Sequence, residues 1–542
     1  MSVENKTINP KDSLQKLAWA AGILFVLVVL AFGLAWAASG FTILLGWDSF
    51  FWVLLISSAL LYGGWRLLGD EKPPRWLFYI LVGAALLRLA MGTLWFAALP
   101  IWGHGTPAES AGYVMGDAAR RDIVAWKLGH SNNPLSAAFE NNRSVDQYGG
   151  LLFLSAIIYR YFGSLYHQPL LMVAVAAACS ALAVLFTWAF ARRVWGEKVA
   201  AISAWAMFLY PEAVLLGSSQ MREAFTIPMV AAAFYGLARY RDERSESKRF
   251  KSGLVWMLVA LLITTFFSTL AGVLLLGALM LAALVLLKPL SPKALHSRWF
   301  WISVVLLVMI GMGVLWLALR EVTPPKLTNP IAMLSWWLRK SAAFQSFLSE
   351  HASGWTQKIF KLTPEWTHLP MLLIYGVVQP FLPAALVVGS EAPIWHWITI
   401  WRSLGWTLLL GFLAFAPFHS LRKNGGQALA GVMTIIIWLV ILVAAFRGGS
   451  DMWDNPRYRA IFACLEIALA AQILVEEDRT RDPWLKRALL MALAILVWFF
   501  PWYLQRYYSI GWSITDPFRI LGLGIVCGVL LVIADWARPE RV

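Results

Sequence analysis

Residues 170–193 read LLMVAVAAACSALAVLFTWAFARR, a predominantly apolar run that closes on two arginines. An α-helix needs about 20 apolar residues to cross a hydrocarbon core of about 30 Å, so we predict a transmembrane helix at about 168–192. Arg192 and Arg193 then belong to a short basic turn, which the positive-inside rule assigns to the cytoplasm. This one stretch therefore predicts both a spanning helix and its orientation.

Similar apolar blocks follow one another along the chain. The sequence has 542 residues, of which 60% are hydrophobic and only 14% are charged. We predict an all-α, polytopic membrane protein of about fourteen transmembrane helices, with both termini in the cytoplasm. The expected spans lie near 17–38, 46–68, 76–101, 168–192, 197–217, 221–240, 252–268, 270–288, 299–320, 399–420, 428–447, 459–476, 485–504 and 517–537.

The basic character of the chain is a topology signal. A net charge of +15 in a soluble protein would suggest nucleic acid, but here the lysines and arginines gather in short loops beside predicted spans, so no nucleic-acid partner is expected. Cys179, Cys464 and Cys527 all fall inside apolar blocks, which gives neither a disulfide framework nor metal-ligand spacing. The first apolar block follows a polar segment without a convincing cleavage site, so we expect a retained span.

The predicted spans divide the chain into four parts. Residues 1–75 form an N-terminal two-helix addition, 76–320 a core with an external loop, 321–398 a second external region, and 399–542 the C-terminal transmembrane helices. Residues 148–163 are apolar but short, and counting them as a span would put the next basic turn outside, so we predict an interfacial helix. Pro380 and Pro383 interrupt the apolar end of 321–398, which favours re-entrant or interfacial helices there.

A polar segment interrupts the apolar blocks at residues 115–122, which read MGDAARRD. Ionised groups are expensive to hold at a membrane, so such a cluster is either a solvated loop or a working site. We favour a site centred on Asp117, the alternative being a loop carboxylate paired with Arg120 or Arg121. If the stretch is helical, Asp122 shares a face with Asp117 and could assist it, or hold with it a divalent metal such as Mg²⁺ or Mn²⁺; otherwise Asp122 is solvated.

The order of segments around Asp117 resembles a known enzyme class. Asp117 is followed by RRDIVAWKLG, then by QYGGLLFLSAIIYRYFG, then by an apolar helix that continues into ARRVWGEKVAAISAWAMFLYPE. Over about residues 76–240 this order resembles the GT-C superfamily of glycosyltransferases, and more narrowly its protein mannosyltransferase and aminoarabinose transferase branch (glycosyltransferase family 39-like). The resemblance implies transfer of a sugar, usually with inversion, from a polyprenyl-phosphate carrier to a lipid, glycan or protein acceptor on the outer face of the cell membrane.

Such a transfer needs a base near the acceptor hydroxyl and positive charge on the leaving phosphate. Asp117 suits the base, because it is the carboxylate at the position that the resemblance indicates. An arginine fork matches phosphate oxygens, and the candidates are Arg222, Arg457 and Arg459. Each has an ordinary alternative: an ion pair with Glu223 at a helix start for Arg222, and anchoring to lipid headgroups for the other two. The supporting residues are Glu223, Tyr148, Asp454, Asn455 and Tyr458.

Other classes of membrane protein compete with this interpretation. A transporter or flippase for a lipid-linked solute is expected to carry charged residues within its spans and broken helices in matching halves. A glycan polymerase or ligase shares the membrane and the substrate but not the loop pattern. An oligosaccharyltransferase is expected to end in a large soluble domain, whereas the sequence given stops soon after its last predicted span.

Overall fold

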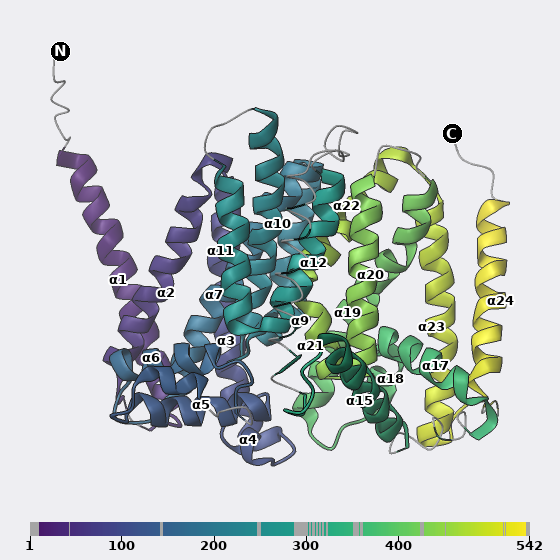
Figure 1. Ribbon diagram of the computed structural model, residues 1–542, viewed down its shortest axis with the longest axis horizontal. Coiled ribbons are helices and arrows are strands. Elements are labelled where there is room, and N and C mark those ends of the chain that lie inside the picture. Colours follow the sequence, from purple (N-terminus) through teal and green to yellow (C-terminus); the bar gives the residue numbers. More distant parts are fainter. Residues whose placement is uncertain are drawn as a thin grey trace.

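The protein is a helical bundle with its long helices roughly parallel, seen in a computed structural model (Figure 1). The structure describes residues 10–42, 44–140, 145–246, 251–286, 323–350, 361–422, 428–449, 451–512 and 516–537, with residues 357 and 514 and scattered positions between 302 and 320. Its described elements are all helical, which confirms the predicted fold class. The predicted span at 299–320 lies largely outside the described residues.

The helices in chain order have the following bounds: α1 Pro10–Ala38, α2 Trp47–Leu67, η1 Gly69–Glu71, α3 Arg75–Trp102, α4 Pro107–Ser110, α5 Gly116–Gly129, η2 Leu135–Phe139, α6 Gly150–Phe162, α7 Leu170–Trp195, α8 Glu197–Leu209, α9 Pro211–Gly217, α10 Glu223–Ser245, α11 Ser252–Phe267, α12 Thr269–Leu286, α15 Pro330–Glu350, α17 Glu365–Val378, α18 Leu382–Val387, α19 Pro393–Arg422, α20 Ala428–Gly448, α21 Asp454–Ala460, α22 Ala463–Thr480, α23 Trp484–Tyr508 and α24 Pro517–Trp536.

Fewer helices qualify as membrane spans than the sequence predicts. Within the described part of the chain, 9 helices are long and apolar enough to cross a membrane, or up to 11 if two bent pairs each count as one span. The expected spans at 197–217 and 459–476 are these bent pairs, with α8 and α9 at 53° and α21 and α22 at 71°. The expected spans at 221–240 and 252–268 are helices, α10 and α11, that fall outside this count. An apolar block thus predicted a helix more reliably than a straight crossing.

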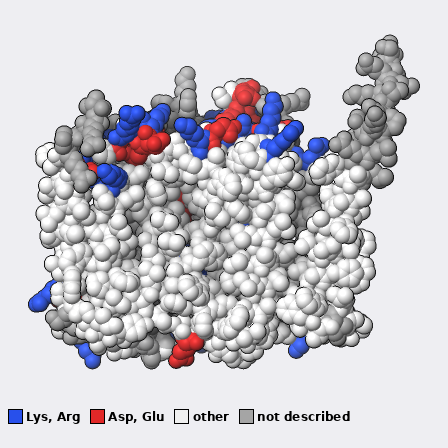
Figure 2. All heavy atoms as spheres, turned by 180° about the vertical axis from the view of Figure 1, so that it is seen from behind, with Lys and Arg blue, Asp and Glu red and all other residues white. Residues whose placement is uncertain are grey.

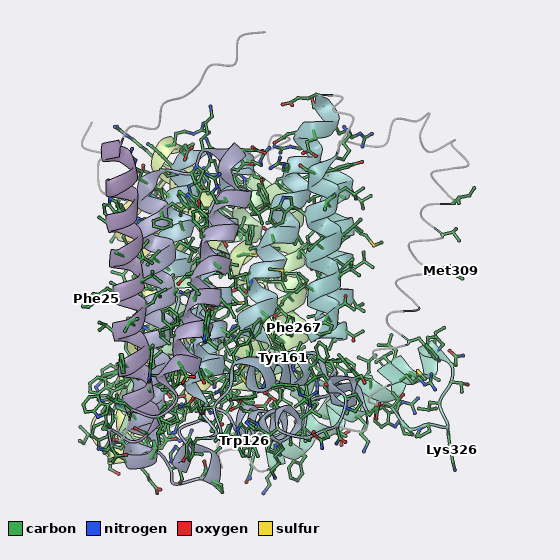
Figure 3. All side chains as sticks on the ribbon, turned by 90° about the vertical axis from the view of Figure 1, so that its left-hand side faces the viewer. Phe25, Trp126, Tyr161, Phe267, Met309 and Lys326 are labelled. Atoms are coloured by element: carbon green, nitrogen blue, oxygen red, sulfur yellow. The ribbon has the colours of Figure 1, made fainter. Side chains whose placement is uncertain are left out.

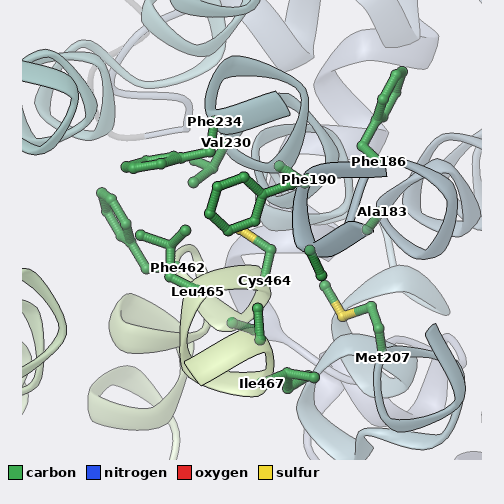
Figure 4. Packing of buried hydrophobic residues seen from close by; sticks show 14 of the residues in the cluster. Ala183, Phe186, Phe190, Met207, Val230, Phe234, Phe462, Cys464, Leu465 and Ile467 are labelled. Carbon is green, nitrogen blue, oxygen red and sulfur yellow. The ribbon is translucent and has the colours of Figure 1, made fainter. Parts of the chain in front are cut away.

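The centre of the bundle is α7. In its most apolar stretch of 18 residues 94% is buried, whereas the corresponding fraction is 11% for α23 and 17% for α24. Alanines recur along α7, and small residues let neighbouring helices approach closely where lipid tails provide no hydrophobic driving force between helices. Aromatic and aliphatic side chains of α7, α8, α10 and α22 interdigitate around it (Figure 4); those labelled include Phe190, Met207, Phe234 and Leu465. The bundle therefore has a tightly packed middle and helices such as α23 and α24 that lie mostly against lipid.

Helices α10 and α11 cross at two glycines. A Cβ built on Gly253 would lie 2.3 Å from the Tyr240 amide nitrogen and 2.5 Å from the Gly236 carbonyl oxygen. A Cβ built on Gly236 would lie 2.8 Å from the Gly253 carbonyl oxygen. Neither position has room for a side chain, so the crossing depends on glycine in both helices.

Charged side chains gather at one end of the bundle, which we call the charged rim (Figure 2). The start of α1 and the end of α24 lie toward it (Figure 1). Glu71, only 5% exposed, accepts hydrogen bonds there from Arg193 and Tyr235, and Arg239 pairs with Asp70 at 2.9 Å. Opposite charges from η1, α7 and α10 therefore close this end of the bundle.

The opposite end, which we call the site end, carries the short and tilted helices. Helices α4, α5, α6, α15, α17 and α18 gather there (Figure 1). Trp126 of α5 lies at this end, below Phe267 at the end of α11, while Phe25 of α1 projects outward from the bundle (Figure 3). With 13 residues, α6 is too short to span, as the sequence predicted for an interfacial helix.

The placement of the two ends generates a topology prediction. In a background with the native cysteines replaced, Asn132→Cys in the exposed turn after α5 and Ser245→Cys at the end of α10 should lie on opposite sides of the membrane. The basic loops predict the charged rim in the cytoplasm. A membrane-impermeant maleimide applied to intact cells should label position 132 and reach position 245 only after permeabilisation; labelling of both from one side would contradict the arrangement.

Candidate active site

Asp117 lies in the first turn of α5, at the site end of the bundle. Its Oδ2 atom is 3.3 Å from Nη1 of Arg457 and 3.6 Å from Nη2 of Arg121. The alternative pairing with Arg121 is therefore present, but a second cation from α21, far away in the sequence, is closer. The Asp117 side chain keeps 28% of its surface exposed, whereas Arg121 is almost completely buried. Asp117 is thus a partly accessible member of a largely buried ionic group.

Arg457 joins three helices through its guanidinium. Its Nε donates to Oε1 of Glu223 at 2.7 Å, and its Nη1 lies between Asp117 and Asp454, the latter 3.5 Å away. These contacts tie α21 to the start of α10 and the start of α5. The expected pair between Arg222 and Glu223 is not formed, because Glu223 faces Arg457 instead.

The ionic group around Asp117 also includes Asp146, a residue that sequence reasoning missed. Its carboxylate is completely buried, with Oδ2 3.6 Å from Arg121 and Oδ1 3.6 Å from Arg222. Oδ2 also accepts the Leu152 amide at 3.0 Å, which fixes the start of α6. Arg222 in turn lies over the ring of Tyr148, 4.9 Å from its centroid. A signal was available, since Asp146 directly precedes the Gln147–Tyr148 segment on which the resemblance rests.

The ionic group keeps Asp117 charged. Burial acts to raise the pKa of its carboxyl, but the positive charges of Arg457, Arg121 and Arg222 outweigh burial and hold the pKa below its ordinary value. Burial lowers the pKa of the Arg121 guanidinium, although Asp146 and Asp117 act in the opposite direction. Asp117 is therefore an ionised hydrogen-bond acceptor at neutral pH, with room on one side.

Asp122 faces away from Asp117, and the expected shared helix face is wrong. Five residues along an α-helix correspond to about 140° of rotation, which puts the two carboxylates on different sides of α5. The Asp122 carboxylate accepts hydrogen bonds from the hydroxyl groups of Tyr113 at 2.7 Å and Tyr159 at 2.8 Å, and lies 3.0 Å from Nε2 of His167. It is buried and anchors α5 to α6 and to the segment before α7.

The expected metal site does not fit this geometry. Asp117 and Asp122 do not converge, and the carboxylates that do surround Asp117 are already engaged by arginines. In the part of the chain that the structure describes, no three His, Cys, Asp or Glu side chains stand close enough to hold a metal ion. Metal binding therefore stays a prediction, and the described residues offer no set of ligands for it.

Arg459 is separated from the Asp117 group, so the expected convergence of three arginines is also wrong. Arg459 is fully buried, and its guanidinium lies 3.3 Å from the centroid of the Trp406 ring. None of its nitrogens has a hydrogen-bond partner among the described residues. Its electrostatic neighbours are instead Tyr210, Glu212, Glu466 and Arg402.

This buried charge cluster lies where the two bent helix pairs meet. Tyr210 is the residue between α8 and α9, Arg459 is in the last turn of α21, and Glu466 is in the first turn of α22. Arg402 of α19 donates from Nε to Glu212 at 2.8 Å and stacks 4.4 Å from the Trp453 ring centroid. Arg402 and Glu212 were not singled out from the sequence because each looked like an isolated charge in or beside an apolar block.

The remaining supporting residues hold α21 in place. Asn455 is buried, and its Nδ2 donates to the carbonyl oxygens of Gly376 at 2.6 Å and Gly449 at 2.8 Å. The Tyr458 hydroxyl donates to Asp454 at 3.4 Å. These contacts fix the short helix that carries Arg457, so Asn455 acts on the orientation of Arg457 and not on a ligand.

A cavity of about 510 Å³ opens directly beside the Asp117 group. Met115 and Gly116, which precede Asp117, and Trp453, which precedes Asp454, form one end of its lining. Its other walls come from α17, α18, the start of α19 and the end of α23. Asp117 itself is not among the lining residues, so this partly aromatic cavity adjoins the ionic group through its sequence neighbours Gly116 and Trp453.

The fold and this site define a polytopic helical membrane protein with an ionic centre and an aromatic cavity at one end. No family model matches the sequence, and no curated protein matches it. Among solved structures, the chain is similar to the archaeal oligosaccharyltransferase AglB from Archaeoglobus fulgidus in complex with an inhibitory peptide and a dolichol-phosphate, at 13% identity and a TM-score of 0.40, over 86% of this chain. It is also similar to the apo form of the oligosaccharyltransferase from the same organism, at 12% identity and a TM-score of 0.41, over 87% of this chain.

The chain spans 57% of the length of each of these two structures. At such identities and TM-scores, the likeness carries no conclusion about activity. The arguments for function rest on the residues themselves.

The different surroundings of the two aspartates predict different effects of the same substitution. Asp122→Asn replaces an acceptor of buried hydroxyl groups and should cost about 1–3 kcal/mol of stability, because a buried donor is left without its acceptor. The side chain at position 117 is partly exposed, so Asp117→Asn should lower the stability less than Asp122→Asn does. Scanning fluorimetry of the two purified variants in the same detergent should give a lower unfolding temperature for Asp122→Asn; the reverse order would contradict the anchoring role of Asp122.

Proposed function

We propose that the protein is an integral membrane glycosyltransferase of the GT-C type, which transfers a sugar from a polyprenyl-phosphate carrier to an acceptor hydroxyl on the outer face of the cell membrane. The observation that carries the proposal is Asp117: an ionised, partly exposed carboxylate at the start of α5, placed among arginines and directly after Gly116, which lines a cavity with aromatic residues in its walls. The sequence resemblance around the same residue supports it independently.

In the proposed reaction, the acceptor hydroxyl attacks the anomeric carbon as the bond from that carbon to the carrier phosphate oxygen breaks. Attack on the face opposite the phosphate inverts the configuration. Asp117 accepts the hydroxyl proton, and the polyprenyl phosphate leaves with the bonding electrons. A carboxylate with a lowered pKa is a weak base, so Asp117 would take the proton late, after orienting the hydroxyl. Its contribution is position and charge more than basicity.

Arg222 and Arg457 are the arginines that we assign to the carrier phosphate. Nε of Arg222 has no hydrogen-bond partner among the described residues, and Arg222 is 14% exposed. Arg457 is already paired with Glu223 and Asp117, so it would share its charge between these carboxylates and the phosphate. We therefore assign the first contact to Arg222, with Arg457 stabilising charge as the leaving group develops.

One observation favours a second candidate, a transporter or flippase for a lipid-linked solute. A transporter is expected to have charged residues within its spans and broken helices. The cluster of Glu212, Arg402, Arg459 and Glu466 is such a group of charges, and it lies where the two bent helix pairs meet. Proteoliposomes loaded with a fluorescent polyprenyl-phosphate sugar distinguish the two functions. Movement of the label between leaflets without acceptor favours the transporter, and acceptor-dependent release of polyprenyl phosphate favours the transferase.

The role of Asp117 predicts a large loss of activity on Asp117→Asn, which keeps the size of the side chain and removes its charge. Loss of a general base typically lowers the rate about a hundredfold to ten-thousandfold. Transfer would be measured with a polyprenyl-phosphate sugar in nanodiscs, with Glu140→Gln, at an exposed carboxylate directly after η2, as the control. Glu140→Gln should keep the parent rate. An Asp117→Asn variant within a few-fold of the parent would move the role of base elsewhere.

The assignment of the phosphate predicts that charge alone is not sufficient at position 457. Arg457→Lys keeps the charge but loses the fork that contacts Glu223 and Asp117 together, so donor use should fall about tenfold or more. Arg222→Lys should behave similarly. Ser245→Arg, which adds an arginine at the charged rim, serves as a control for added charge. Normal turnover in both Arg457→Lys and Arg222→Lys would leave the donor phosphate without an assigned site.

A further inference from the structure

The cavity beside Asp117 has a second chemical feature at its far wall. Arg506 lines it from the end of α23, together with Tyr503 and Tyr507. The Arg506 guanidinium lies 5.3 Å from the Trp502 ring centroid and 5.5 Å from that of Tyr507. Aromatic rings on two sides restrict the orientation of a guanidinium without neutralising it.

Arg506 differs from the arginines around Asp117 in having no carboxylate partner. It forms no ion pair and no hydrogen bond with any residue that the structure describes, whereas Arg457 faces three carboxylates. A cation that lines a cavity, is oriented by rings and is not neutralised is suited to bind an anion. Trp453 lines another wall with a ring of the kind on which sugar rings stack, and the buried Trp395 packs edge-on against it, with the two ring centroids 4.7 Å apart.

The acidic residue of the cavity does not cancel this charge. Glu109 accepts hydrogen bonds from the Thr106 amide at 3.0 Å, from the Thr106 hydroxyl at 2.9 Å and from the indole nitrogen of Trp395. Burial acts to raise the pKa of Glu109, but these hydrogen bonds outweigh it and lower the pKa. His104 is its electrostatic neighbour, and His396 also lines the cavity. Glu109 is thus engaged at its own wall, in α4.

We infer that this cavity is the acceptor site, and that it takes an acceptor carrying an anionic group, a phosphate or a carboxylate. The anion pairs with Arg506, the hydroxylated part lies against the aromatic walls, and the accepting hydroxyl points to the end lined by Gly116, next to Asp117. This inference rests on the proposed glycosyl transfer. The anion could belong to a soluble acidic sugar or to a lipid headgroup, which share this chemistry.

The test measures binding without any sugar donor, by native mass spectrometry and thermal shift of the full chain in detergent. The probes are glucuronate as a soluble acidic sugar, dioctanoyl phosphatidylglycerol as an anionic lipid, and dioctanoyl phosphatidylcholine as a zwitterionic lipid of equal chain length. Arg506→Gln removes the charge and keeps most of the length. The matched control is Arg519→Gln, because Arg519 in the first turn of α24 is 80% exposed and lies 3.8 Å from Asp516.

Arg506→Gln should weaken binding of at least one anionic probe about tenfold or more, while Arg519→Gln leaves it unchanged. Dependence with glucuronate indicates a soluble acceptor, and dependence with phosphatidylglycerol alone indicates a lipid. Gly389→Trp should also abolish binding by filling the cavity, because a Cβ there would meet only the Tyr508 hydroxyl, at 3.8 Å. This second variant answers the question if Arg506→Gln does not fold.

Equal affinity of the parent and Arg506→Gln for both anionic probes would overturn the inference. It would also be overturned if phosphatidylcholine bound as tightly as the anionic probes and lost affinity to the same extent in Arg506→Gln. Asp117→Asn should bind the probes like the parent, which separates this test from that of the proposed function. If Asp117→Asn is inactive but binding ignores Arg506, only the acceptor assignment fails. If binding depends on Arg506 but Asp117→Asn transfers sugar normally, the assignment of the base fails.

Discussion

The contact between Arg457 and Asp117 is the interaction on which the site depends. It joins a short helix after a break, a helix from a polar loop and, through Glu223, the start of α10. An unpaired charge in such largely buried surroundings would be costly, so each member needs the others. The arrangement therefore holds three segments in register next to the cavity that Gly116 and Trp453 line.

The helices were predictable from the sequence, and their paths were not. Apolar length indicates that a segment such as 197–217 is helical and buried, but the bend at Tyr210 comes from Pro211 and from the neighbours that Glu212 finds, Arg402 above all. The site shows the same limit. Asp117 could be singled out from the sequence because its loop resembles a known pattern. Asp146 and Arg506 gain meaning only from residues that are distant in the sequence. The orientation of Asp122 was in principle calculable from helix geometry alone.

Trp453 lies between two groups of charges, the buried cluster around Arg459 and the ionic group around Asp117. On one side, Trp453 stacks on Arg402 of the buried cluster; on the other, it precedes Asp454, which faces Arg457. It also lines the cavity. Both groups contain buried polar atoms without a hydrogen-bond partner among the described residues: the nitrogens of Arg459 in the buried cluster, and Nε of Arg222 and Oδ1 of Asp146 in the group around Asp117.

The position of α23 couples the cavity to the bilayer. Only 11% of the most apolar stretch of α23 is buried inside the protein, so the wall that carries Arg506 is the more exposed one, whereas Met115 and Gly116 at the other end directly precede Asp117 and its contact with Arg457. Helices tilt to match the thickness of the hydrocarbon around them. A thicker or thinner membrane would consequently shift one wall against the other and change the width of the cavity, making lipid composition a determinant of which molecules fit.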